Sequence, residues 1–143
     1  MKDIPDESVD MVLTDPPYGM AFQSGYRTIR YEKIKGDFAP KTEFIILFHK
    51  GRRLINGKRD PNVFEYSKTR NELHPTQKPV DMTEYMLSKF SDKGDIILDP
   101  FMGSGTTGIA CKNLNRNFIG MELEENYFNI AKERIENHEE AHT

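Results

Sequence analysis

Residues 15–18, Asp-Pro-Pro-Tyr, place a carboxylate, two prolines and an aromatic ring directly after a short apolar run. An aromatic amine is a poor nucleophile, because its lone pair is delocalised into the ring. Asp15 can accept one amine hydrogen and the Pro16 carbonyl the other, which turns the lone pair toward a methyl donor and stabilises the developing charge. Pro17 helps to fix this backbone, and Tyr18 offers a face on which an extruded base can stack. We interpret these four residues as catalytic, without a metal; the alternative is an Asp-Pro turn with a tyrosine at its rim.

Residues 103–108, GSGTTG, match the pattern G-x-G-x-x-G, follow an apolar run and are followed by a helical pattern, with Glu122 19 residues after Gly103. Glycines allow a tight turn against which a ligand can lie, and an acid at the end of the next strand can bind two ribose hydroxyls. The pattern predicts an adenosine-containing cofactor. The Lys of a phosphate-binding loop is absent, so triphosphate hydrolysis is disfavoured. A nicotinamide cofactor, or a turn without a ligand, remains open on this pattern alone.

The periodicity of apolar residues predicts strands alternating with helices, which is typical of a doubly wound, mostly parallel α/β sheet. The helix over 80–90 is opened by Pro79 and has Val80, Thr83, Met86, Leu87 and Phe90 on one face. The other predicted elements are strands at 9–14, 43–49, 95–99 and 117–122 and helices at 106–113 and 124–137.

The composition fits one domain of a cytoplasmic protein: 143 residues, 36% apolar and 30% charged, with no apolar run long enough to span a membrane. The one cysteine, Cys111, is interpreted as a buried helix residue. The net charge is −3, yet residues 41–78 hold 9 Lys/Arg against 4 Asp/Glu. A turn-rich basic loop in this stretch suits DNA phosphates, although a solvated charged loop is the alternative. Its candidate DNA-binding residues are Lys50, Arg52, Arg53, Lys58 and Arg59.

Four motifs together resemble the amino-methylating DNA methyltransferases of the permuted, or beta, class. They are LTDPPYG (13–19), LHPTQKP (73–79), LDPFMGSGTT (98–107) and FIGMELEENYF (118–128), in the order of that class. The resemblance implies the Rossmann-like fold of S-adenosylmethionine-dependent methyltransferases. It also implies methyl transfer to N6 of adenine in double-stranded DNA, as in restriction-modification systems. Cytosine N4 is the alternative acceptor.

The resemblance also implies roles for particular residues. Asp15, Pro16 and Tyr18 would be catalytic, Glu122 would bind the ribose, and the segment 74–79 would line the methionine end of the cofactor. The residues expected at the cofactor are His74, Thr76, Gln77, Lys78, Asp99, Phe101, Gly103, Ser104, Gly105, Thr106 and Glu122. The expected partner is DNA, with a second copy of the chain as a further candidate, and no membrane.

The chain is expected to be one catalytic domain in three parts: 1–38 with the catalytic motif, 39–72 with a late strand and the basic loop, and 73–143 with the cofactor site. Asp15 and His74 are separated by only 59 positions. Strands that the class carries between them, and one before Asp15, are not recognisable. We therefore expect an abridged fold, with a junction near residues 35–39. The rival functions are an inactive module that binds cofactor or DNA and a nicotinamide oxidoreductase.

Overall fold

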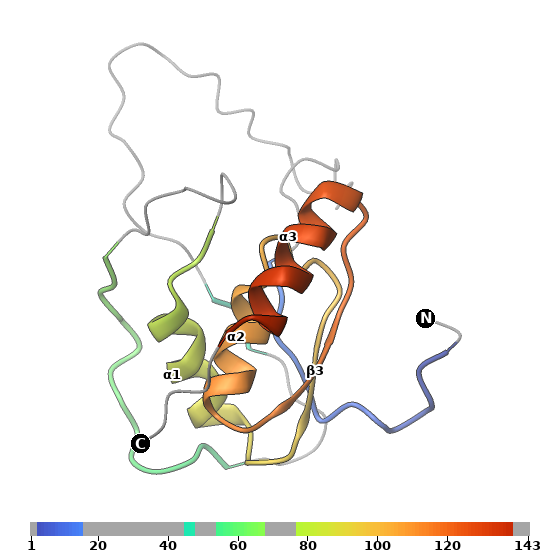
Figure 1. Ribbon diagram of the computed structural model, residues 1–143. Coiled ribbons are helices and arrows are strands. Elements are labelled where there is room, and N and C mark those ends of the chain that lie inside the picture. The colour runs from blue at the N-terminus through green and yellow to red at the C-terminus, as the bar shows by residue number, and fades with distance from the viewer. Residues whose placement is uncertain (1–2, 16–44, 48–53, 68–76, 139–143) are drawn as a thin grey trace, which may run out of the picture. The chain divides into compact units, whose positions relative to one another are not determined.

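A computed structural model describes residues 3–15, 45–47, 54–67 and 77–138 (Figure 1). The chain divides into two units, residues 1–17 with 55–143 and residues 18–54. Every helix and strand among the described residues belongs to the first unit. That unit contains most of the predicted cofactor site.

Three parallel strands form a small sheet in the order β1-β2-β3. The strands are β1 (Met11–Val12), β2 (Ile96–Asp99) and β3 (Asn117–Gly120). β1 pairs with β2 in the register Met11 to Ile97, and β2 pairs with β3 in the register Ile97 to Phe118. Because parallel strands end at the same edge, the residues that follow β1, β2 and β3 are brought together. The predicted α/β class with a parallel sheet is confirmed.

Three helices accompany the sheet: α1 (Val80–Phe90), α2 (Thr106–Asn113) and α3 (Glu125–Glu136). α2 joins β2 to β3 and packs against both α1 and α3 (Figure 1). It is buried over most of its length, from Thr106 to Cys111. The other two helices are amphipathic: α1 buries Thr83, Met86 and Leu87, and α3 buries Ala131.

The centre of the core is formed by Leu87, Ile97, Ala110 and Cys111, which are fully buried. These residues come from α1, β2 and α2, so the core lies between the sheet and the first two helices. Burial raises the pKa of the Cys111 thiol to about 12. The thiol is therefore protonated and unreactive at neutral pH, in agreement with the structural interpretation of this cysteine.

The helices over 80–90 and 106–113 are confirmed with the predicted bounds, and Pro79 occupies the N-cap of α1. The strands are shorter than predicted, and β1 has only two residues. Hydrogen bonds from the Asp10 and Leu13 N–H groups to the carbonyls of Ile96 and Leu98 nevertheless continue its pairing with β2.

The predicted buried strand at 43–49 is wrong at the residues that the structure describes. Ile45, Ile46 and Leu47 belong to no strand, and all three are exposed, Ile46 by 74%. A strand that is apolar on both faces needs neighbouring strands and covering layers, and the described residues provide neither for this segment. Among the described residues, no helix is long and apolar enough to cross a membrane.

Candidate active site

Acidic residues follow or end all three strands at the carboxyl edge of the sheet. Asp15 lies beyond β1, Asp99 is the last residue of β2, and Glu122 lies beyond β3. The pairing of Val12 with Leu98 brings the residues that follow β1 to the end of β2, where Asp99 lies. The sheet thus brings the first and third sequence motifs to one place.

Asp99 is the buried member of this group, with 4% of its surface exposed. Its carboxylate accepts hydrogen bonds from Thr107 Oγ1 at 2.7 Å and from the Phe101 N–H at 3.1 Å. Burial raises the pKa of Asp99, while hydrogen bonds from Thr107, Thr14 and the Phe101 N–H oppose the increase. Asp99 therefore ties the end of β2 to the start of α2 and to the residue before Asp15.

Asp15 forms an ion pair with Lys78, with 3.2 Å between Asp15 Oδ2 and Lys78 Nζ. Both side chains are partly exposed, by 33% and 26%. Lys78 was expected at the methionine end of the cofactor, and the structure brings it to the predicted catalytic carboxylate. The backbone carbonyl of Lys78 also accepts a hydrogen bond from Thr106 Oγ1, at 3.4 Å.

The glycine-rich turn that precedes α2 requires glycine at its last position. Gly105, the N-cap of α2, has φ 81°, which is unfavourable for residues with a side chain. A Cβ atom there would lie 3.1 Å from the Cβ of Ala131 and 3.2 Å from its Cα. Gly105 therefore lets the turn adopt its conformation and lets α3 approach it closely.

Glu122 bridges the turn and the residue before α3. Its Oε2 atom accepts the Gly103 N–H and its Oε1 atom accepts the Glu124 N–H, both at 3.0 Å. A carboxylate oxygen has two lone pairs, so each oxygen can still accept a hydroxyl donor. The arrangement leaves Glu122 able to bind a diol while it holds the turn.

Gln77 presents an acceptor without a donor: its Oε1 atom is buried and has no hydrogen-bond partner. Leaving such an atom unsatisfied costs about 1–3 kcal/mol, and a ligand with a donor group would remove this cost. A ligand ammonium or amide would suit this position. Gln77 immediately precedes Lys78, whose carbonyl accepts a hydrogen bond from Thr106 Oγ1 directly after the glycine turn.

Arg134 of α3 is a residue of this region that the sequence analysis did not identify. Its Nη1 atom donates to the Ser104 carbonyl at 3.0 Å, and lies 3.4 Å from Ser104 Oγ and 3.5 Å from Thr106 Oγ1. Burial lowers the pKa of Arg134. Arg134 follows Ala131 by three positions, so both lie on one face of α3. This spacing was the signal in the sequence that could have identified Arg134.

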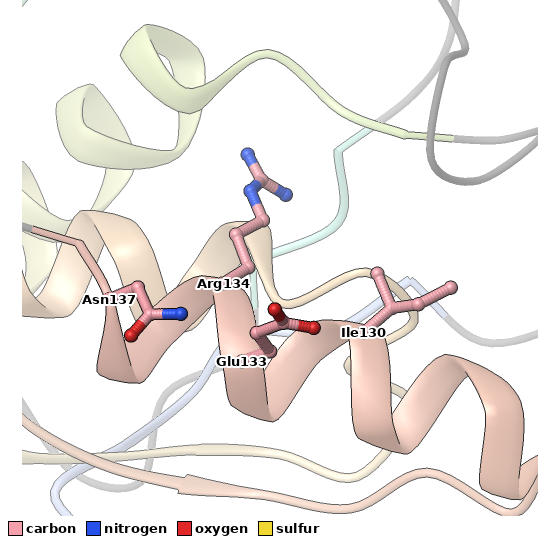
Figure 2. Close-up of a pocket in the computed structure, with 4 residues that line it drawn as sticks. All are labelled: Ile130, Glu133, Arg134 and Asn137. Carbon is pink, nitrogen blue, oxygen red and sulfur yellow. The ribbon is translucent and has the colours of Figure 1, made fainter.

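A shallow hollow on α3 is lined by Ile130, Glu133, Arg134 and Asn137 (Figure 2). It includes neither a predicted catalytic residue nor the glycine turn. Among the described residues, no cluster of three His, Cys, Asp or Glu side chains could hold a metal ion.

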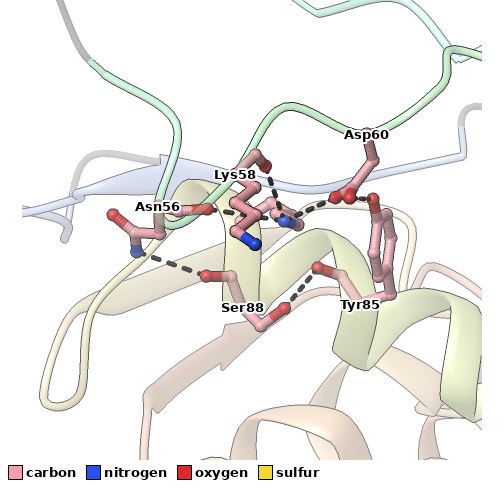
Figure 3. A network of polar contacts seen from close by, with 6 residues as sticks. Asn56, Lys58, Asp60, Tyr85 and Ser88 are labelled. Carbon is pink, nitrogen blue, oxygen red and sulfur yellow. Dashed lines mark hydrogen bonds and ion pairs between the residues drawn. The ribbon is translucent and has the colours of Figure 1, made fainter.

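Residues 55–64, called the docked segment below, contain no helix or strand and are fixed to α1 by polar contacts (Figure 3). The Asn56 N–H donates to the Lys89 carbonyl at 3.0 Å. The Asn56 Nδ2 atom donates to the Ser88 and Ser91 carbonyls at 3.2 and 3.0 Å and to Asp92 Oδ1 at 3.0 Å. Asn56 therefore caps the C-terminal end of α1 from another part of the chain.

Asp60 makes the second attachment of the docked segment. Its Oδ2 atom lies 2.5 Å from Lys89 Nζ and accepts the Tyr85 hydroxyl at 2.6 Å. The contact with Lys89, followed by that with Tyr85, lowers the pKa of Asp60, and the same hydrogen bond raises the pKa of Tyr85 to about 12. The Phe64 ring packs on Tyr85 with 5.0 Å between centroids.

The predicted DNA-binding residues are only partly described. Lys58 and Arg59 are exposed in the docked segment, and the Lys58 carbonyl accepts a hydrogen bond from Lys89 Nζ at 3.1 Å. The contacts therefore fix the backbone and leave both basic side chains accessible. The predicted site residues that lie outside the described residues are Pro16, Pro17, Tyr18, Lys50, Arg52, Arg53, His74 and Thr76.

Comparison with known proteins adds a family match. A family model described as DNA methylase, of the N6 and N4 type, matches residues 55–133. The type II methyltransferase M.HpaI of Haemophilus parainfluenzae is 42% identical over 87 residues, which cover 57% of this chain and 28% of the relative. The type II methyltransferase M2.DpnII of Streptococcus pneumoniae is 42% identical over 90 residues, covering 59% of this chain and 34% of the relative. The chain thus spans about a third or less of the length of these relatives.

Among solved structures, the M1.HpyAVI-SAM complex is 43% identical to this chain with a TM-score of 0.47. The match covers 57% of this chain and 43% of that one. The family match begins within the docked segment and includes the glycine turn and Glu122.

Proposed function

The chain belongs to the DNA methylase family of the N6 and N4 type, and we propose that it transfers a methyl group from S-adenosylmethionine to N6 of adenine in double-stranded DNA. The observation that carries this proposal is that Asp15 follows β1 and Asp99 ends the paired parallel strand β2, at the strand edge where the glycine turn begins. A hydrogen-bond acceptor for a target amine and a turn suited to a nucleoside cofactor thus share one edge of the sheet.

The described residues fit the proposed cofactor. Glu122 can accept the two ribose hydroxyls, the turn at 103–105 has two glycines at positive φ with no side chain to obstruct a ligand, and Gln77 offers a buried acceptor without a partner. When bound, S-adenosylmethionine supplies an electrophilic methyl group: the amine lone pair forms the N–C bond, and the electrons of the broken C–S bond remain on sulfur. The surplus proton of the nitrogen leaves to water.

In this proposal, residues of the chain hold the target amine and its base in the orientation needed for methyl transfer. Asp15 and the Pro16 carbonyl accept the two amine hydrogens, and Tyr18 stacks on the extruded base. Exposed Lys58 and Arg59 contact DNA phosphates, in common with Lys50, Arg52 and Arg53. These contacts position the duplex without reading its sequence.

The choice between adenine and cytosine is tested by the product. DNA is incubated with labelled S-adenosylmethionine, digested to nucleosides and separated. The Asp-Pro-Pro-Tyr sequence favours N6-methyladenine, and N4-methylcytosine as the sole product would overturn this choice while leaving the family assignment intact.

The role of Asp15 is tested by Asp15→Ala. Since the aspartate contacts the amine and not the cofactor, we expect methyl transfer to fall by at least about 100-fold, while the Kd for S-adenosylmethionine stays within about twofold. Transfer is measured with labelled cofactor and binding by calorimetry. Turnover comparable to that of the wild type would refute the assigned role.

A second candidate function is cofactor binding without turnover. It is favoured by the exposed, non-strand conformation of Ile45, Ile46 and Leu47, where the resemblance led us to expect a buried strand. Calorimetry that detects S-adenosylmethionine binding, combined with no transfer to any DNA offered, would support this candidate over the first.

A further inference from the structure

Lys78 reaches the predicted catalytic carboxylate from a fixed backbone. Its carbonyl accepts a hydrogen bond from Thr106 Oγ1 at the start of α2, and the next residue, Pro79, is the N-cap of α1. From this position Lys78 Nζ lies 3.2 Å from Asp15 Oδ2. The backbone of Lys78 is thus fixed at the starts of α1 and α2, and its ammonium group reaches Asp15 beyond the end of β1.

The contact engages only one oxygen of Asp15. Among the described residues, Oδ2 pairs with Lys78 while Oδ1 accepts no hydrogen bond. A neighbouring carboxylate, Asp99, is buried and near enough for the two charges to interact. The positive charge of Lys78 therefore offsets a local concentration of negative charge and restricts the rotation of the Asp15 side chain.

We propose that Lys78 is a positioning residue for methyl transfer, which holds Oδ2 of Asp15 so that Oδ1 is presented to the target amine. This inference rests on the proposed function and assigns Lys78 a role other than lining the methionine end of the cofactor. Lys78 acts before and during formation of the N–C bond and gains or loses no proton. The surplus proton of the amine still leaves to water.

The two roles of Lys78 predict different kinetics. If Lys78 positions Asp15, Lys78→Met lowers kcat by about 10- to 100-fold at saturating cofactor and DNA, because a displaced acceptor orients the amine poorly. The KM and Kd for S-adenosylmethionine then stay within about twofold. Lys78→Arg, which keeps the charge, recovers most of the kcat.

The matched control is Lys93→Met, which removes an exposed lysine between α1 and β2, away from the carboxyl edge of the sheet. It is expected to leave kcat unchanged. An unchanged kcat in Lys78→Met together with a raised KM for S-adenosylmethionine would overturn the proposal in favour of a cofactor contact. Failure of Lys78→Arg to recover activity would likewise count against it.

A double-mutant cycle tests the pairing without turnover. The free energy of unfolding is measured for the wild type, Asp15→Asn, Lys78→Met and the double variant. For a partly exposed ion pair we expect a coupling of about two- to fivefold in the unfolding equilibrium constant. Additive effects would contradict the pairing of Asp15 with Lys78. The inference about Lys78 would then be wrong, while the proposed function would not be affected. A wild-type chain that transfers no methyl group would contradict the proposed function itself.

Discussion

The glycine turn and the docked segment are both held in place by a helix, but in different ways. The turn at 103–105 is fixed by its own backbone and by the close approach of α3, whose Ala131 leaves no room for a side chain at Gly105. The docked segment has no regular structure and is held by side chains, chiefly Asn56 and Asp60, that contact α1. Glu122 and Arg134 also hold the turn by hydrogen bonds, so the proposed cofactor site depends on close packing in addition to polar contacts, whereas the proposed DNA-contacting loop depends mainly on a few polar groups.

Gly105→Ala is expected to have the largest effect on stability. The substitution combines an unfavourable φ of 81° with a Cβ atom 3.1 Å from that of Ala131. Backbone strain and overpacking together should lower the free energy of unfolding by about 3 kcal/mol. Urea denaturation measures the change.

Gly94→Ala is the control for strain alone, because Gly94 has φ 90° and nothing within 4 Å of an added Cβ atom. We expect a loss of about 1–2 kcal/mol there. Equal losses of unfolding free energy at both positions would show that packing against α3 does not stabilise the turn. The contrast between the glycine turn and the docked segment would then be wrong.

Asn56→Ala should have a smaller and local effect. The variant loses three side-chain hydrogen bonds to the end of α1, but Ser88 is exposed to water and the Ser91 carbonyl keeps a hydrogen bond from Arg116 Nη2. We expect opening of the docked segment to become about fivefold more favourable, or about 1 kcal/mol, with little change in global stability, because the contacts of Asp60 remain. Limited proteolysis within residues 55–64 measures this opening.

Asn62→Ala removes an exposed amide from the same segment and should leave the proteolysis rate unchanged. A global loss of stability in Asn56→Ala equal to that of Gly105→Ala would show that the docked segment unfolds together with the core, contrary to the difference drawn between the two regions.

The smallest effect is a change in titration at high pH. The hydrogen bond to Asp60 raises the pKa of Tyr85 to about 12 from its ordinary value of 10.0. A raised folded-state pKa contributes stability that is complete below the unfolded-state pKa and is lost as the pH rises through the folded-state value. The attachment should therefore weaken only between about pH 10 and 12, which ultraviolet absorbance of the phenolate can follow.

Asp60→Asn keeps Tyr85 but removes the negative charge beside its hydroxyl, so the pKa of Tyr85 should fall toward its ordinary value. Tyr85→Phe should remove that component altogether. A late component that persists in Tyr85→Phe would assign it to another of the six tyrosines.

Regular elements were predictable from the sequence because their signals are local. The face formed by Thr83, Met86 and Leu87 predicted α1, and the glycine pattern before Thr106 predicted α2 with its observed start. Both follow from residue spacing within one helix, which needs no knowledge of distant contacts.

Contacts that depend on tertiary structure were not predictable in the same way. Arg134 is part of a charged helix in the sequence, and only the packing of α3 brings it to the Ser104 carbonyl. Asn56 lies in a basic, turn-rich stretch, and its partners are 32 to 36 positions away. The strand expected at 43–49 failed for the related reason that a strand depends on partners outside its own sequence.

The Asn56-Gly57 step has a consequence for the chemical lifetime of the protein. An asparagine followed by glycine is prone to loss of its side-chain amide, and here that amide donates three of the hydrogen bonds that attach the segment to the end of α1. Conversion to a carboxylate would leave only acceptors facing two carbonyls and the Asp92 carboxylate. Chemical change of this one side chain would thus turn an attachment into a repulsion and permanently weaken the contact of the docked segment with α1, while the contacts of Asp60 remain.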